Sequence, residues 1–219
     1  MSLLDNLPLA VFFFVTWIGI FSLALAFFRI KLYPYIKPML LTVLVLTPLS
    51  WTLIQLMKIN HYFHILNAPL EITAAALCMR YLFKLNGTDS FMMVTLSYGI
   101  AVFMENITSM IVNDYQMERA ASTLASGIMH QEWIFAFLLF LFSYAFTFFR
   151  LGFTVVNKHR KTSISARYRL VIALTFCSVW FSNISVHFLE DLFLLSTYLI
   201  FFVFGYLCIR LYRLELEED

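Results

Sequence analysis

The chain has 219 residues, of which 62% are hydrophobic and only 13% are charged, and its formal net charge is +2. Its mean hydropathy of +0.83 lies outside the range of soluble globular domains, which excludes that class and predicts an integral membrane protein. Uninterrupted apolar stretches of about 20 residues recur along the sequence, and each is long enough to cross a hydrocarbon core of roughly 30 Å as a helix.

Charged and turn-forming residues divide these stretches into seven predicted transmembrane helices. The first is expected to be retained rather than cleaved as a signal peptide, because no basic residue precedes it and its apolar region is too long. Together they predict an all-α polytopic bundle over residues 1–213, followed by the start of a cytoplasmic signalling helix at 214–219. In chain order, the spans are predicted near residues 8–28, 38–57, 62–83, 91–112, 133–155, 169–189 and 192–212.

Basic residues are distributed unevenly between alternate loops. One side of the predicted bundle collects thirteen Lys and Arg residues, and the other side has Lys58 and Arg119 alone. Because cytoplasmic loops carry the excess of Lys and Arg, this asymmetry predicts an outside N-terminus and a cytoplasmic C-terminus. Glu190 and Asp191 would then make a tight outer turn between the last two spans.

The longest outer loop, residues 113–132, has apolar residues at helical spacing, beginning with Met117, Ala120 and Leu124. The pattern predicts a short amphipathic helix at the membrane surface. Two interpretations stay open: the helix is a connector that rests on lipid headgroups, or it is a lid over an opening in the bundle.

Polar side chains within the predicted spans gather on single helical faces. These faces hold Thr47, Trp51 and Gln55 in the second span, His64, Asn67 and Glu71 in the third, Tyr98, Glu105 and Ser109 in the fourth with Asn106 beside them, and Ser178, Ser182 and Ser185 in the sixth, flanked by Asn183. With the orientation above, most of these residues fall in the outer half of the bundle. A charged side chain in mid-bilayer costs roughly 2.5–3.5 kcal/mol on insertion scales, so we expect Glu71 and Glu105 to face the interior, across from one another.

Two explanations of these polar residues stay open. Membrane helices most often use Ser, Thr and Asn to hydrogen-bond to neighbouring helices, which is the simpler explanation of the serine stripe in the sixth span. Acidic residues inside a membrane are functional more often, so Glu71 and Glu105 are candidates for contact with a ligand as well as for a structural role.

The sequence lacks the motifs of common enzyme and metal sites. It has no phosphate-binding glycine loop, no His-Glu-x-x-His and no Gly-x-Ser-x-Gly. His61 and His64 are about one helical turn apart but have no third ligand nearby, and Cys78 is about 21 Å along the helix from His64, too far for a catalytic pair. No catalytic, cofactor-binding or metal-binding residue is therefore predicted.

The organisation of nearly the whole chain resembles the membrane sensor domain of bacterial peptide-pheromone (quorum-sensing) receptor histidine kinases. The resemblance rests on seven spans with an outside N-terminus, a short cytoplasmic turn in "MRYLFKLNGTDSFMMVTLSYGIAVFMENI", a basic turn "KHRKTSISARYR", and a last span that continues into "IRLYRLELEED". In that family the last span leads to a dimerisation helix bearing the phospho-accepting His, and then to an ATP-binding domain. Residues 1–219 end before either, so the resemblance implies an isolated sensor module, a piece of a longer kinase, or a relative without a kinase domain.

The resemblance further implies a multi-pass protein of the bacterial cytoplasmic membrane that acts as a homodimer in a two-component system. An extracellular peptide, or another small ligand, would enter the outer half of the bundle and bias two arrangements of the helices, with the last span passing the change inward. No cofactor and no nucleic-acid partner is expected. The residues expected to bind the ligand are Gln55, His64, Asn67, Glu71, Glu105, Asn106, Ser109 and Asn183.

Two other classes of function stay open. A small transporter, or a substrate-binding transport subunit, would also use intramembrane acids, with Glu71 and Glu105 as proton or cation sites. An interaction protein that merely occupies the membrane would need no ligand site. The substitution Glu105→Gln separates the three classes, because a receptor would lose its ligand response, a proton-coupled carrier would lose uptake, and a scaffold would lose neither.

Overall fold

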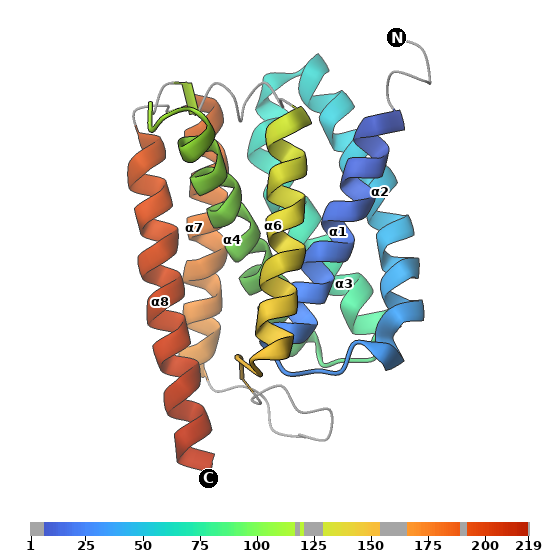
Figure 1. The fold of residues 1–219 in the computed structure, drawn as a ribbon, viewed down its shortest axis with the longest axis vertical. Helices are drawn as coiled ribbons and strands as arrows, with labels where there is room; N and C mark the ends of the chain where they lie inside the picture. Colours follow the sequence, from blue (N-terminus) through green and yellow to red (C-terminus); the bar gives the residue numbers. More distant parts are fainter. Residues whose placement is uncertain (1–6, 117–118, 121–128, 154–165, 189–191, 219) are drawn as a thin grey trace.

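The structure is a computed structural model that describes residues 7–116, 119–120, 129–153, 166–188 and 192–218. All regular structure in these residues is helical, as the composition predicts (Figure 1). Two single 3₁₀ turns, Tyr33–Tyr35 and His61–Phe63, precede the second and third long helices. The long helices are α1 (Leu7–Phe27), α2 (Ile36–Ile59), α3 (His64–Leu82), α4 (Gly87–Val112), α6 (Met129–Phe148), α7 (Ala166–Phe188) and α8 (Phe193–Glu218).

The long helices differ in how apolar they are. The apolar helices among the described parts of α6 and α7 are short, Glu132–Phe148 and Ile172–Val186, and α3 carries Asn67, Glu71 and Arg80. The bundle therefore has four candidate membrane spans by length and composition, which suggests a membrane protein. These spans are Leu7–Phe27, Tyr33–Ile59, Gly87–Val112 and Phe193–Arg213.

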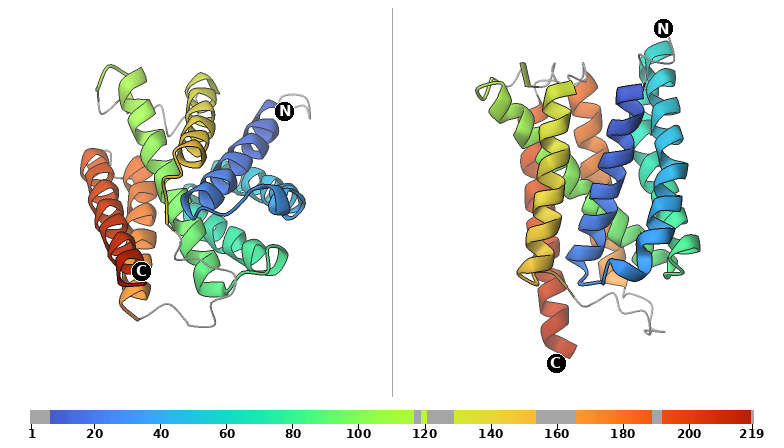
Figure 2. Two further views of the ribbon diagram at one scale, coloured as in Figure 1. Left: turned by 60° about the horizontal axis from the view of Figure 1, so that its bottom comes forward. Right: turned by 45° about the vertical axis from the view of Figure 1, so that its right-hand side comes forward.

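Helix α4 forms the centre of the bundle. It packs against α1, α3, α6, α7 and α8, and it crosses between two groups of helices (Figure 2). Helices α1, α2 and α3 form one group, α7 and α8 form the other, and α6 lies against α1 and α4. Helix α3 also packs against α7, so the two groups touch directly as well as through α4.

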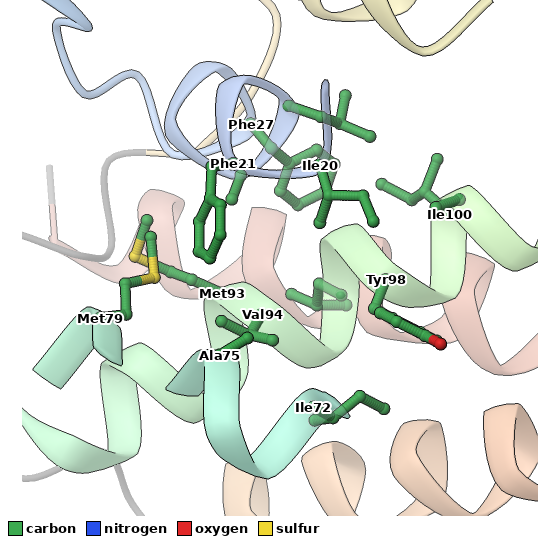
Figure 3. Close-up of a cluster of buried hydrophobic side chains, with 14 of the residues drawn as sticks. Ile20, Phe21, Phe27, Ile72, Ala75, Met79, Met93, Val94, Tyr98 and Ile100 are labelled. Carbon is green, nitrogen blue, oxygen red and sulfur yellow. The ribbon is translucent and has the colours of Figure 1, made fainter. Parts of the chain in front are cut away.

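Buried apolar side chains fill the space between α1, α3 and α4. Phe21, Met79 and Met93 have no exposed surface, and the ring of Phe21 points toward both methionines (Figure 3). Lipid is as apolar as these side chains, so dispersion contacts from close packing, rather than the hydrophobic effect, hold such helices together. This packing positions the middle of α4, where Tyr98 marks the transition from the apolar core to a buried polar cluster.

Helix α6 begins and ends earlier than predicted. It ends at Phe148, whereas the predicted span continues to residue 155. Gly152 adopts a φ of 127°, and a Cβ at this position would lie 2.4 Å from the carbonyl oxygen of Phe27, so glycine is required. The chain can then approach the end of α1, where the Phe153 N–H donates to that same carbonyl at 2.8 Å. Hydropathy does not reveal this end, because the residues beyond the helix remain largely apolar.

Three predicted features lie partly or wholly outside the described residues. In the segment 113–132, residues 117–118 and 121–128 are outside, so the predicted amphipathic helix is not described. Its described parts are a turn after α4, a helical pair at residues 119–120, and residues that belong to α6. The basic turn within 154–165 and the outer turn at Glu190 and Asp191 are likewise outside.

Successive helices run in opposite directions, so residues from opposite helix ends meet in the same half of the bundle (Figure 1). We call the half in which α1, α3, α6 and α8 begin, and in which α2, α4 and α7 end, the polar half. The residues predicted to bind a ligand fall in it or, for Glu71, close to the middle. The opposite end carries exposed basic residues, among them Arg29, Lys31, Arg80, Lys84 and Arg150.

Candidate functional site

Four helices contribute to a buried hydrogen-bonded cluster centred on Glu71 of α3. The Ser50 hydroxyl donates to Glu71 Oε1 (2.5 Å), and the Tyr98 hydroxyl donates to Glu71 Oε2 (2.6 Å). The indole Nε1–H of Trp17 donates in turn to Ser50 Oγ (3.0 Å). These four residues, which we call the Glu71 cluster, are at most 9% exposed. The cluster ties α1, α2, α3 and α4 together near the middle of the bundle.

The positions of these groups in their helices explain why they meet. Each lies near the middle of a largely apolar helix, where an indole or carboxyl group must find a partner on another helix and a hydroxyl group can supply one. The Tyr98 hydroxyl points away from the apolar side chains of Met79 and Met93 (Figure 3). Both oxygens of Glu71 are used by uncharged donors, which fixes the carboxyl group in place.

A second acidic position lies further into the polar half on α4. Glu105 is half-buried and about two helical turns beyond Tyr98. It interacts electrostatically with Glu132, in the first turn of α6, and with Glu71. The Oε2 atom of Glu132 is buried and has no hydrogen-bond partner among the described residues. The Glu105 carboxyl group on α4 therefore lies near enough to those of Glu71 on α3 and Glu132 on α6 to be affected by their charge.

A second hydrogen-bonded cluster joins α4 to α7 and α8. Asn106 is 2% exposed, and its Nδ2 group donates to Ser182 Oγ (3.2 Å) and Thr197 Oγ1 (3.1 Å). About one turn away, the Ser185 hydroxyl donates to Ser196 Oγ (2.7 Å). We call these five residues the Asn106 cluster. Its hydrogen bonds hold three helices together, which explains Ser182 and Ser185 of the serine stripe on the sixth span.

Three of the eight residues predicted to bind a ligand are hydrogen-bonded within the bundle. Glu71 and Asn106 are the centres of the two clusters, and the Ser109 hydroxyl donates to the carbonyl of Ala120 (2.8 Å). This last bond holds a described part of the segment 113–132 against α4. Contacts within the protein therefore account for the hydrogen bonds of all three side chains.

The other five predicted residues are half-buried in the polar half. Three of their polar atoms, Gln55 Nε2, Asn67 Oδ1 and Asn183 Oδ1, are buried without a hydrogen-bond partner among the described residues. They come from α2, α3 and α7, and α3 packs against both of the other helices. Buried polar atoms in native proteins are nearly always paired. A polar group of a ligand would therefore gain the most binding free energy by forming hydrogen bonds with these three atoms and with Glu132 Oε2. The five residues are Gln55, His64, Asn67, Glu105 and Asn183.

Sequence reasoning missed several side chains that build this region. On the second span it favoured Trp51, whereas the structure uses Ser50, about 100° around the helix. A signal existed for Trp17, because an indole N–H in the middle of an apolar helix usually needs a partner. Hydroxyl groups give a weaker signal, since they can bond to the preceding turn of their own helix. The missed residues are Trp17, Ser50, Glu132 and Thr197.

Metal-ligand geometry is not found in the described part of the chain, where no three His, Cys, Asp or Glu side chains are placed to hold a metal ion. The three cysteines, Cys78, Cys177 and Cys208, are free thiols. The chemistry of the region is therefore that of hydrogen bonds and carboxyl groups.

No protein-family model matches the sequence, and no curated protein or solved structure is significantly similar to it. Function has to be inferred from the two clusters, the acidic side chains and the unpaired polar atoms.

Proposed function

We propose that the protein is a membrane-embedded sensor that binds an extracellular signal, a peptide or another small ligand, in the polar half of its bundle. One observation carries the proposal: four buried polar atoms in this half have no partner among the described residues. Leaving such an atom unpaired costs roughly 1–3 kcal/mol, so a ligand that pairs with several of them gains free energy on binding. The atoms are Gln55 Nε2, Asn67 Oδ1, Glu132 Oε2 and Asn183 Oδ1.

In the proposed topology, all seven helices cross a bacterial cytoplasmic membrane, with the polar half outside and the C-terminus inside. The exposed basic residues at the opposite end support this orientation, because Lys and Arg concentrate in cytoplasmic loops. Helices α3, α6 and α7 are less apolar or shorter in their apolar parts, but each packs against α4, which shields polar groups from lipid.

The two clusters support a route for the signal. Ligand contacts on α3, α6 and α7 would shift these helices relative to α4, and the Asn106 cluster links α4 to α7 and α8. Helix α8 extends past the other helices at the end opposite the polar half (Figure 1), and in a homodimer it would carry the change to a cytoplasmic output. The ligand achieves this if its affinity differs between the two helix arrangements.

A second candidate function is a small transporter or a substrate-binding transport subunit. It is favoured by the electrostatic interaction of Glu105 with Glu71 and Glu132, because intramembrane acids that influence one another are typical of proton and cation pathways. In that case Glu71 and Glu105 would exchange a proton or cation with the transported substrate.

Binding can be tested by thermal unfolding of the purified protein in lipid nanodiscs, with a library of short linear and cyclic synthetic peptides as the probe. A peptide present at about 100 times its Kd should stabilise the protein by about 2.7 kcal/mol. We expect Asn67→Ala and Asn183→Ala to lose most of this stabilisation. The matched control is Ser178→Ala, because the Ser178 hydroxyl bonds to the Thr175 carbonyl in its own helix and should not contact the ligand.

Equal stabilisation of the wild type and both asparagine variants would contradict the proposed site. Proteoliposomes give the second arm of the experiment. Peptide uptake that requires a pH gradient and is lost in Glu105→Gln would show a transporter instead of a sensor.

A further inference from the structure

Helix α3 runs continuously from His64 to Leu82 and contains Pro69 in its second turn. Proline has no N–H, so the carbonyl of Ile65, four residues earlier, loses its helical partner. The indole Nε1–H of Trp180, on α7, donates to that carbonyl oxygen at 2.6 Å. A side chain from another helix therefore replaces the backbone hydrogen bond that the proline removes, which is one way in which membrane helices satisfy a freed backbone group.

The following turn of α3 is also modified. The Thr73 hydroxyl donates to the Pro69 carbonyl (2.7 Å), and threonine bonds of this kind often bend helices. Helix α3 thus has a short first segment, residues 64–68, before the proline and a longer segment after it. The first segment carries Asn67 with its unpaired Oδ1, whereas the second is held by the hydrogen bonds of Glu71.

We propose that Trp180 is a positioning residue for the polar half: it fastens residues 64–68 of α3 to α7, while the joint at Pro69 lets this segment tilt separately from the rest of α3. The inference rests on the proposed function, because a ligand that contacts Asn67 moves α7 through Trp180 and leaves the Glu71 cluster in place. Asn183, about one turn from Trp180, puts a second unpaired atom on the helix that is moved.

Helix α2 provides a matched contrast. It contains Pro48, which frees the carbonyl of Leu44 in the same way, and the Thr52 hydroxyl donates to the Pro48 carbonyl (2.7 Å). Leu44 is 60% exposed on the outside of the bundle, and no side chain from another described helix donates to its carbonyl. The proline of α2 therefore lacks the cross-helix bond that distinguishes the proline of α3.

A double-mutant cycle in lipid nanodiscs, without ligand, tests the proposal. Trp180→Phe removes the N–H and keeps a ring, and Pro69→Ala restores a backbone N–H for the Ile65 carbonyl. We expect Trp180→Phe to lower Tm by about 2–4 °C with Pro69 present, and by much less in the Pro69→Ala background. In the Pro48→Ala background, Trp180→Phe should keep its full effect.

A measurement of position separates this role from general stability. Spin labels replace exposed Leu66 in the first segment of α3 and exposed Leu174 on α7, and a control pair uses Leu77 with Leu174. Trp180→Phe should broaden the 66–174 distance distribution and leave the 77–174 distribution unchanged. Adding Pro69→Ala should narrow the first distribution again.

Equal effects of Trp180→Phe with and without Pro69, or equal broadening for both label pairs, would overturn the proposal. Because no ligand is used, this result is independent of whether the peptide library identifies a binder. The role of Trp180 and Pro69 can therefore be confirmed even if no peptide binds. A peptide can likewise bind even if the role of Trp180 and Pro69 is disproved.

Discussion

Glu71 accepts a hydrogen bond on each carboxyl oxygen, and its donors come from different helices. Removing one donor leaves a buried oxygen unpaired while the other bond persists. The protein should lose only part of its free energy of unfolding, because interhelical side-chain hydrogen bonds in membrane proteins contribute about 0.6 kcal/mol on average and up to about 1.7 kcal/mol.

We therefore expect Tyr98→Phe to lower the free energy of unfolding by roughly 0.6–1.7 kcal/mol, as measured by denaturant titration in mixed micelles. The control is Tyr144→Phe, because Tyr144 is 66% exposed on α6 and its hydroxyl makes no hydrogen bond within the described structure. Equal losses in the two variants would show that the bond to Glu71 adds nothing to stability.

Glu71 and Asn106 were predictable from the sequence, since a carboxyl or amide group in an apolar helix is rare and must be paired. Their partners were not. Helical periodicity shows which side chains share a face of one helix, but not which faces of different helices meet. Ser50 and Thr197 were therefore missed, although each completes a cluster whose central residue had been identified.

At the scale of the element, α4 and α7 approach closely at Gly99. A Cβ at this position would lie 3.3 Å from Val179 Cγ2 and 3.7 Å from Thr175 Cγ2, so a larger side chain has no room. Small residues allow membrane helices to approach in this way, and the hydrogen bond from Asn106 to Ser182 joins the same pair of helices.

Gly99→Leu should push α7 away from α4, lengthen the bond from Asn106 to Ser182 and cost roughly 1–3 kcal/mol, as overpacking typically does. Thermal unfolding in nanodiscs measures the loss. Gly205→Leu on α8 is the matched control, since a Cβ there meets nothing within 4 Å. If the Tm of Gly99→Leu were as high as that of the control, the close approach of α4 and α7 at Gly99 would not be needed for stability.

The apolar helices of the described residues were predictable because apolar length is a strong signal in a chain of this composition, although four of them, not seven, are long and apolar enough to be candidate membrane spans. The ends were less predictable. Helix α6 ends where Gly152 allows the chain to fold onto the end of α1, and that requirement is a contact with Phe27, distant in sequence. Hydropathy averages over a window and does not register such a contact.

At the scale of the whole molecule, the bundle has two hydrogen-bonded clusters, and α4 belongs to both. Tyr98 joins it to α1, α2 and α3, through Glu71 and its partners, and Asn106 joins it to α7 and α8. Any displacement of α4 would therefore strain hydrogen bonds to both groups of helices.

The proposed orientation predicts the outcome of reporter fusions at the C-terminus. Green fluorescent protein fused after residue 219 should fluoresce, and alkaline phosphatase fused there should be inactive, because the basic ends of the helices are retained in the cytoplasm. A phosphatase inserted after Asn60, between α2 and α3, should instead be active. The opposite pattern would invert the topology and place the polar half inside.

Helix α8 packs against α7 and α4, its Phe204 ring lies 5.8 Å from that of Phe27 on α1 between centroids, and Thr197, near its start, is bonded to Asn106. From Thr197 to its last residue, Glu218, the helix measures roughly 31 Å at 1.5 Å per residue. Pivoting about Thr197 by about 5° would sweep the far end through nearly 3 Å, by the geometry of a rod of that length. Such a pivot would make α8 a lever, because a movement smaller than a bond length near Thr197 would become one of about 3 Å at Glu218.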